Sequence, residues 1–166
     1  MDIQEFAERF PQRMKKLKDF VENEAPVIMG NEAINHFKES FVNEGFTDET
    51  LEKWPEVERR KPDSPWYGHT SDKENKYFLA SRTTAKILTN SEQLGEGFRK
   101  EFIPGGVKII NDKPYAAVHQ RGLPAKIYGK TPFTMPRRRF VGKSKVMIRN
   151  INNELLTEIK KIIKGK

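Results

Sequence analysis

The sequence predicts an α+β fold with N-terminal helices, a small and mainly antiparallel β-sheet, and a long amphipathic C-terminal helix. Apolar residues recur at helical spacing in residues 2–44, two strand-like runs flank a proline-glycine turn at residues 104–106, and a helical apolar stripe ends the chain. With 166 residues and 36% hydrophobic content, the chain is expected to form a single domain over residues 1–166.

Residues 2–44 are expected to form two or three helices. Asp2 is suited to cap a short first helix that ends before Pro11, because proline is tolerated in the first turn of a helix and poorly deeper inside. Pro26 is expected to end one helix or start another, and Gly45 is a plausible stop.

Two segments lack any sustained period and are expected to be mobile loops, residues 46–83 and residues 123–136. The first is polar and interrupted by prolines, although its two tryptophans favour some packing. The second contains three prolines. A loop as long as 46–83 within a small domain is usually functional or disordered.

The regular elements of the second half are shorter. Residues 87–94 predict a short strand or turn that enters a brief helix, and residues 101–110 predict a β-hairpin. Residues 115–120 are expected to form a short helix that ends at Gly122. The C-terminal helix carries one apolar stripe, formed by Ile148, Ile151, Leu155, Ile159 and Ile162.

Charge is unevenly distributed along the chain. The net charge is +8, yet residues 1–60 hold 9 basic and 14 acidic residues, whereas residues 113–153 hold ten basic residues and no acidic one. Such a division suits self-association through unlike faces, or a basic face near nucleic acid. A solvated surface with uneven charge is the simplest interpretation of the charge alone.

Several function classes lack their sequence signatures. The chain has no cysteine, which excludes disulfides, cysteine-ligated zinc and a thiol nucleophile. It shows no glycine-rich phosphate loop, nucleophile elbow or paired-histidine metal motif. No signal peptide or membrane-spanning run is recognisable. We therefore expect no enzymatic activity, no cofactor, no metal site and no membrane partner.

The three histidines stand far apart in sequence. His36 is expected to be solvated on the polar side of a helix, and His69 lies in the long loop. His119 is expected to be half-buried and hydrogen-bonded, since small and aromatic residues flank it. An acid–base role for His119 with a remote carboxylate is the only enzymatic alternative.

The run Arg137, Arg138 and Arg139 has three interpretations. It could contact phosphate, pair with acidic residues of a neighbouring subunit, or form a solvated loop. Interleaved aromatic residues favour an interface, and truncating these arginines is then expected to change stability by about 0.5 kcal/mol or less each. The expected interface residues are Tyr115, His119, Arg121, Tyr128, Phe133, Arg137, Arg138, Arg139 and Phe140.

Three motifs occur in a fixed order before the C-terminal helix: ILTNSEQL at 87–94, YAAVHQRG at 115–122 and MPRRRFVG at 135–142. Their order and spacing resemble the phage virion morphogenesis (tail completion) family over roughly residues 87–165. The chain departs from the family pattern at Gly95, at Arg121, where an aromatic residue is common, and at Arg139, where proline is more usual.

The resemblance implies a structural protein of a tailed phage or prophage that acts in tail completion or head–tail joining. It implies a homo-oligomeric ring, contacts with other head, neck or tail proteins, and possible contact with DNA passing through the ring. Its location would be the bacterial host cytoplasm during assembly, and then the virion. The alternative is a stand-alone basic nucleic-acid-binding protein, which the pI of about 9.6 favours.

Overall fold

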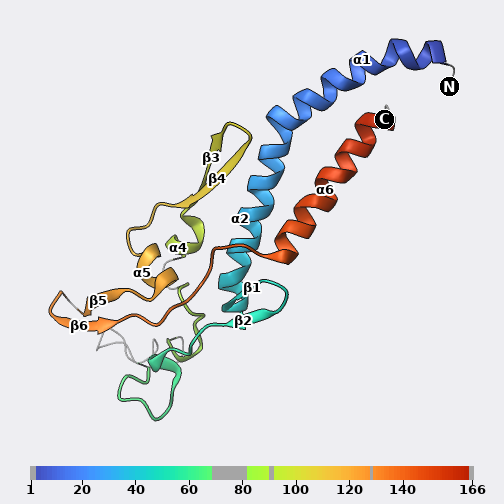
Figure 1. Cartoon of the computed structure of the whole chain (residues 1–166). Coiled ribbons are helices and arrows are strands. Elements are labelled where there is room, and N and C mark those ends of the chain that lie inside the picture. The colour runs from blue at the N-terminus through green and yellow to red at the C-terminus, as the bar shows by residue number, and fades with distance from the viewer. Residues whose placement is uncertain (1–2, 69–81, 90–91, 128, 165–166) are drawn as a thin grey trace. The chain divides into compact units, whose positions relative to one another are not determined.

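The computed structural model describes residues 3–68, 82–89, 92–127 and 129–164. Helices occupy both ends of the chain, and three separate two-stranded sheets lie between them in sequence (Figure 1). The α+β class is confirmed, although three hairpins replace the one small sheet that the sequence predicts. The chain divides into two compact units that alternate along the sequence. A single domain over residues 1–166 stays a prediction.

The first unit comprises Met1–His36, Arg99–Ile110 and Lys143–Lys166. Helix α1 (Ile3–Asp19) continues through a π-helical turn (Phe20–Glu24) into α2 (Ala25–Asn43), whose first part belongs to this unit. Phe20 in the π turn is only 2% exposed. Helix α6 (Lys145–Lys164) contacts α1, and the hydroxyl of Ser144 accepts a hydrogen bond from the Met147 amide, which caps the start of α6.

The predicted helix boundary at Pro11 is wrong, because α1 runs through that residue. A proline inside a helix removes one hydrogen bond and costs about 3 kcal/mol. The apolar positions Phe10, Met14 and Leu17 keep their helical spacing across the proline, and the contact with α6 favours a continuous helix. Pro26 lies where the π turn passes into α2, and the helical chain continues through this point without a break, so the expected helix end or new start at Pro26 is not seen.

The hairpin expected at residues 101–110 is confirmed as β3 (Phe98–Ile103) and β4 (Gly106–Asn111). It packs closely on α2, since a Cβ at Gly30 would meet the Lys100 side chain at 2.5 Å and Val107 at 3.3 Å. The Lys100 ammonium donates a hydrogen bond to the Asn31 amide oxygen at 2.6 Å. Glycine at position 30 therefore allows this approach.

The second unit comprises Phe37–Phe98 and Asn111–Gly142. Its core is a cluster of aromatic rings in edge and tilted contacts, with centroids 5.3 to 6.4 Å apart; its members are Phe37, Phe41, Trp54, Phe98 and Phe140. Such geometries are the favoured ones for aromatic pairs. The unit also contains several short elements: β1 (Gly45–Thr47), β2 (Leu51–Lys53), a 3-10 turn (Glu58–Arg60), α4 (Gln93–Glu96) and α5 (Ala116–Arg121).

Both predicted loops contain regular structure. Strands β1 and β2 pair antiparallel inside the first, and residues 69–81 of it lie outside the described residues. The second contains the antiparallel pair β5 (Pro124–Ile127) and β6 (Thr131–Thr134). Each strand of a two-stranded sheet has a free edge, which is where proline is tolerated, so Pro124 and Pro132 do not prevent pairing. The mobility of both segments stays a prediction.

Candidate functional site

The second and third sequence motifs lie against each other in the second unit. Helix α5 ends at Gly122, which adopts φ 69° and reverses the chain, as the sequence predicts. A Cβ at Gly122 would lie 3.0 Å from the Met135 carbonyl oxygen and 3.0 Å from the Arg137 side chain. The start of segment 135–142 therefore passes directly beside the end of α5.

Gln120 joins these two motifs through both ends of its amide. Its oxygen accepts hydrogen bonds from the backbone amides of Phe140 at 2.9 Å and Val141 at 3.2 Å, and its nitrogen donates to the Val141 carbonyl at 2.8 Å. The Arg138 amide donates to the His119 carbonyl at 2.8 Å. We call this arrangement of residues 119–120 and 138–141 the motif clamp.

The three arginines of the third motif have different environments. Arg137 is exposed. Arg138 is only 4% exposed, and its guanidinium donates to the Pro55 carbonyl at 3.0 and 3.3 Å. The Arg139 guanidinium lies 4.0 Å from the centroid of the Phe46 ring. The expected stability change of about 0.5 kcal/mol or less applies to exposed side chains, so the burial of Arg138 contradicts it for that residue.

Burial changes the electrostatics of the clamp. It lowers the pKa of the Arg138 guanidinium, and burial together with the nearby Arg138 charge lowers the pKa of His119. His119 is half-buried, as expected, and its ring meets Tyr115 edge-on with centroids 6.2 Å apart. Its Nδ1 atom is buried and has no hydrogen-bond partner among the described residues, so the hydrogen bond expected of His119 is not made by this atom. The arrangement favours a neutral imidazole.

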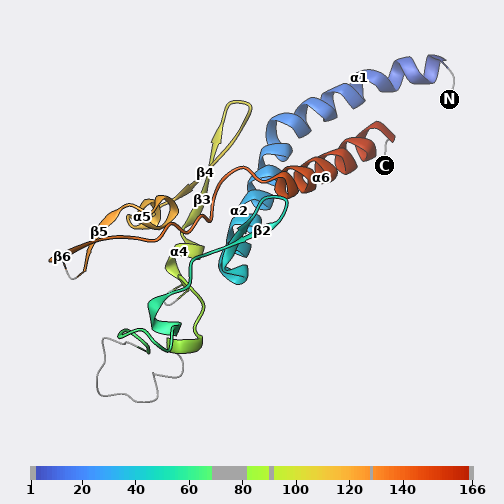
Figure 2. The same ribbon diagram turned by 60° about the horizontal axis from the view of Figure 1, so that its bottom comes forward.

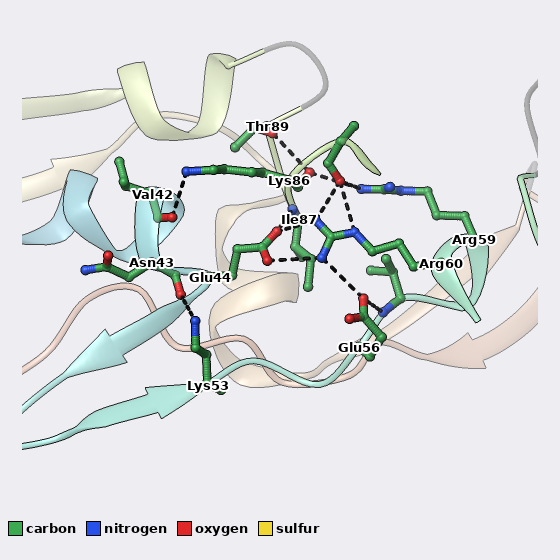
Figure 3. A network of polar contacts seen from close by, with 12 residues as sticks. Val42, Asn43, Glu44, Lys53, Glu56, Arg59, Arg60, Lys86, Ile87 and Thr89 are labelled. Carbon is green, nitrogen blue, oxygen red and sulfur yellow. Dashed lines mark hydrogen bonds and ion pairs between the residues drawn. The ribbon is translucent and has the colours of Figure 1, made fainter. Parts of the chain in front are cut away.

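The first motif is anchored by a second polar network, shown in Figure 3. The Arg60 guanidinium pairs with the Glu44 carboxylate at 2.5 and 3.0 Å, and it also donates to the Ala85 carbonyl. The same carboxylate accepts a hydrogen bond from the Ile87 amide at 2.6 Å. The Arg60 hydrogen bond is the main reason that the pKa of Glu44 lies below its usual value.

Arg59 completes this network by donating to the backbone carbonyls of Arg82, Ala85 and Lys86. The carbonyls of an irregular segment need partners when they are buried, and two guanidinium groups provide five donors each. The network therefore fixes the chain that leads into residues 87–94. Sequence reasoning did not identify the roles of Glu44, Arg59, Arg60 and Gln120. Only Gln120 lies inside one of the three motifs, and this position was the one indication in the sequence that such a residue has a role.

The nine expected interface residues do not form one exposed surface. Phe140 is 1% exposed and belongs to the aromatic core, and Arg138 is buried. Tyr115, Arg121 and Arg137 are exposed, whereas His119, Phe133 and Arg139 are intermediate. Tyr128 lies outside the described residues. A partner contact through the exposed members stays a prediction. His36, expected to be solvated, is 7% exposed instead, and His69 lies outside the described residues.

Clustered metal ligands and long apolar helices are both missing from the described residues. Among them, no three His, Asp or Glu side chains gather closely enough to hold a metal ion. No described helix is long and apolar enough to cross a membrane. The site is a set of interlocked polar and aromatic contacts that fix three motifs, which is the character of a structural domain.

The chain belongs to the phage virion morphogenesis family, whose pattern matches residues 56–160. This match confirms the resemblance, and it begins well before residue 87. No curated protein and no solved structure shows significant similarity to the chain.

Proposed function

We propose that this protein acts in tail completion or head–tail joining of a tailed phage or prophage by assembling into a homo-oligomeric ring. The family match over residues 56–160 carries the proposal, since it includes all three motifs. The ring would contact other head, neck or tail proteins, with DNA passing through it. Assembly would take place in the cytoplasm of the bacterial host, and the protein would remain in the virion.

The helices of the first unit support self-association. None of the 20 residues of α6 is buried, although the helix carries an apolar stripe. Ile148, Leu156 and Ile163 are 45%, 50% and 53% exposed, and Phe10 and Met14 on α1 are 48% and 47% exposed. Exposed apolar patches of this kind mark interaction sites, and an amphipathic helix gains most of its stability from covering such a face.

Unlike faces favour a ring over a symmetric dimer. A head-to-tail contact joins two different surfaces of the same chain and closes into a ring when the rotation permits. The exposed Tyr115, Arg121 and Arg137 supply a basic, aromatic surface, and the acidic N-terminal sequence supplies carboxylates. We propose that these three residues contact a neighbouring subunit.

The test is the mass of the purified protein by light scattering, together with negative-stain electron microscopy. We expect a ring-sized oligomer for the parent, and a monomer or a much weaker oligomer for Leu156→Glu with Ile163→Glu. The matched control is Asn153→Glu with Thr157→Glu, which adds the same charge to polar positions of α6. A parent that stays monomeric at high concentration, and also when its phage partners are present, would contradict ring assembly.

We also propose that the protein has no hydrolase, nuclease or transferase activity. The family match and the structural use of the clamp residues support this. The measurement is turnover of labelled DNA by the parent and by His119→Ala. Reproducible turnover that the substitution abolishes would overturn it.

A further inference from the structure

A hollow of about 220 Å³ lies between α1 and α6 in the first unit. The two helices are in contact, and both ribbon views show the C-terminal end of α6 beside α1 (Figures 1 and 2). The lining consists of Arg9, Gln12, Arg13 and Lys16 from α1 and of Ile162 and Lys164 from α6. Of the six lining residues that the structure describes, four are cationic and none is acidic.

Helix geometry explains the convergence. Positions 9, 13 and 16 are spaced i, i+4 and i+7, which places their side chains on one face of α1, and Gln12 lies on the same face. The contact between the helices then brings Lys164 of α6 to that face. Sequence reasoning did not single out these residues, because they lie in the acidic N-terminal sequence and only the contact with α6 brings Lys164 to them.

We propose that this hollow, which we call the basic hollow, binds the phosphodiester backbone of nucleic acid. Like charges that converge in one place repel each other, so the arrangement favours an anion between them. Arg13 offers a planar fork that matches two phosphate oxygens, whereas Lys16 and Lys164 act as point charges. Gln12 adds a neutral amide donor. The inference rests on the proposed function and deepens it, since it assigns a site to the DNA partner.

The chemistry favours backbone contact with a duplex. Among the described lining residues there is no aromatic side chain on which an unpaired base could stack. Duplex DNA carries about one negative charge per 1.7 Å of axis, whereas an extended acidic peptide carries at most one carboxylate per about 3.3 Å. The convergence of Arg13, Lys16 and Lys164 suits the denser of these two charge distributions. The net charge of +8 adds long-range attraction that raises the rate of encounter.

The experiment measures binding of the full-length protein to a fluorescently labelled DNA duplex by anisotropy, over a range of salt concentrations. The duplex has about 20 base pairs, which is longer than one turn of the double helix. We compare the parent with Arg13→Ala and Lys16→Ala together, since alanine preserves the helix. The matched control is Lys126→Ala with Lys130→Ala, which removes the same charge from exposed positions of the β5–β6 hairpin. Circular dichroism and thermal melting confirm that each variant is folded.

We expect the parent to bind with a steep salt dependence. The Arg13 and Lys16 variant should lower the salt slope by about 2, because each lost phosphate contact lowers it by about 1. Its affinity should fall on the order of tenfold or more near 0.1 M salt. The control should change both quantities by less than half as much. Single-stranded DNA of equal length should bind no more tightly than the duplex.

Three results would overturn the proposal. The first is no binding of the duplex by the parent at low salt, and the second is an equal loss of affinity for the variant and its control. The third is displacement of the duplex by polyglutamate at equal charge concentration. The second result would mean that only net charge matters, and the third would indicate an acidic protein partner. Because the binding assay needs no ring and no phage partner, a failure to bind DNA would not contradict ring assembly. A failure of the protein to form a ring would likewise not contradict DNA binding by the basic hollow.

Discussion

The two compact units use their polar and apolar residues in opposite ways. In the second unit, Arg60, Gln120 and Arg138 point inward and satisfy backbone carbonyls or a carboxylate. In the first unit, α6 leaves its apolar stripe partly exposed, and α1 and α6 gather cations around a hollow. The comparison teaches that a basic or aromatic residue in a motif need not be an interface residue.

The physical reason lies in the types of element. The second unit has short strands and irregular segments, whose backbone groups need side-chain partners when they are buried. Helices satisfy their own backbone internally, so the side chains of α1 and α6 are available for contacts with other molecules. Stability and assembly therefore depend on different residues, and substitutions can separate the two.

The largest effect is expected from Arg138→Ala. The substitution leaves the Pro55 carbonyl without its charged donor and opens space next to the clamp, so the free energy of unfolding should fall by about 3 kcal/mol. Arg137→Ala is the matched control, with a loss of about 0.5 kcal/mol or less expected at an exposed site. Urea denaturation measures both. Equal, small losses would show that the buried arginine contributes no more than the exposed one.

Glu44→Gln is expected to lower the free energy of unfolding by about 2 kcal/mol, since it weakens both the Arg60 pair and the bond from the Ile87 amide. The loss should depend on pH. The pKa of Glu44 is lower in the folded protein than its usual value of 4.5, so its stabilisation is fully present above 4.5 and disappears as pH falls through the folded pKa.

Urea denaturation from pH 7 to pH 3 checks this dependence. The difference between the parent and Glu44→Gln should shrink below pH 4.5. Glu101→Gln is a control, because its partner Lys108 is 3.3 Å away and both side chains are more than half exposed. A difference for Glu44→Gln that stays constant down to pH 3 would mean that the carboxylate charge is not what stabilises the network.

A smaller loss, about 1 to 2 kcal/mol, is expected for Gln120→Ala, because the amides of Phe140 and Val141 lose their acceptor. Arg121→Ala, one position further along α5 and exposed, should change stability by no more than about 0.5 kcal/mol. Hydrogen exchange of residues 138–142 gives a direct measurement of the clamp. Unchanged protection of these amides in Gln120→Ala would show that Gln120 does not hold the third motif.

The smallest effect concerns His119. Burial and the nearby Arg138 charge lower the pKa of the imidazole below 6.5. The folded protein therefore binds this proton less readily than the unfolded chain, and the contribution of His119 to stability falls as pH drops below 6.5. An NMR titration of the His119 ring protons should show a midpoint below that in urea. A midpoint at or above the urea value would contradict the buried, neutral imidazole.

The sequence by itself determined the local features. The C-terminal helix follows from its apolar stripe, the β3–β4 hairpin from its proline-glycine turn, and the end of α5 from Gly122, whose φ of 69° suits glycine. The order of the three motifs along the chain was also sufficient to indicate the family. These signals depend on residue order and on neighbours a few positions apart, which the sequence displays directly.

Only the tertiary structure decided which charged and aromatic residues are buried. Arg138 bonds to Pro55 across 83 positions, and the Glu44 carboxylate reaches Ile87 across 43. The continuation of α1 through Pro11 and the convergence of Arg13, Lys16 and Lys164 likewise depend on the contact with α6. Contacts over such separations depend on how distant elements pack, and neither local periodicity nor net charge carries that information.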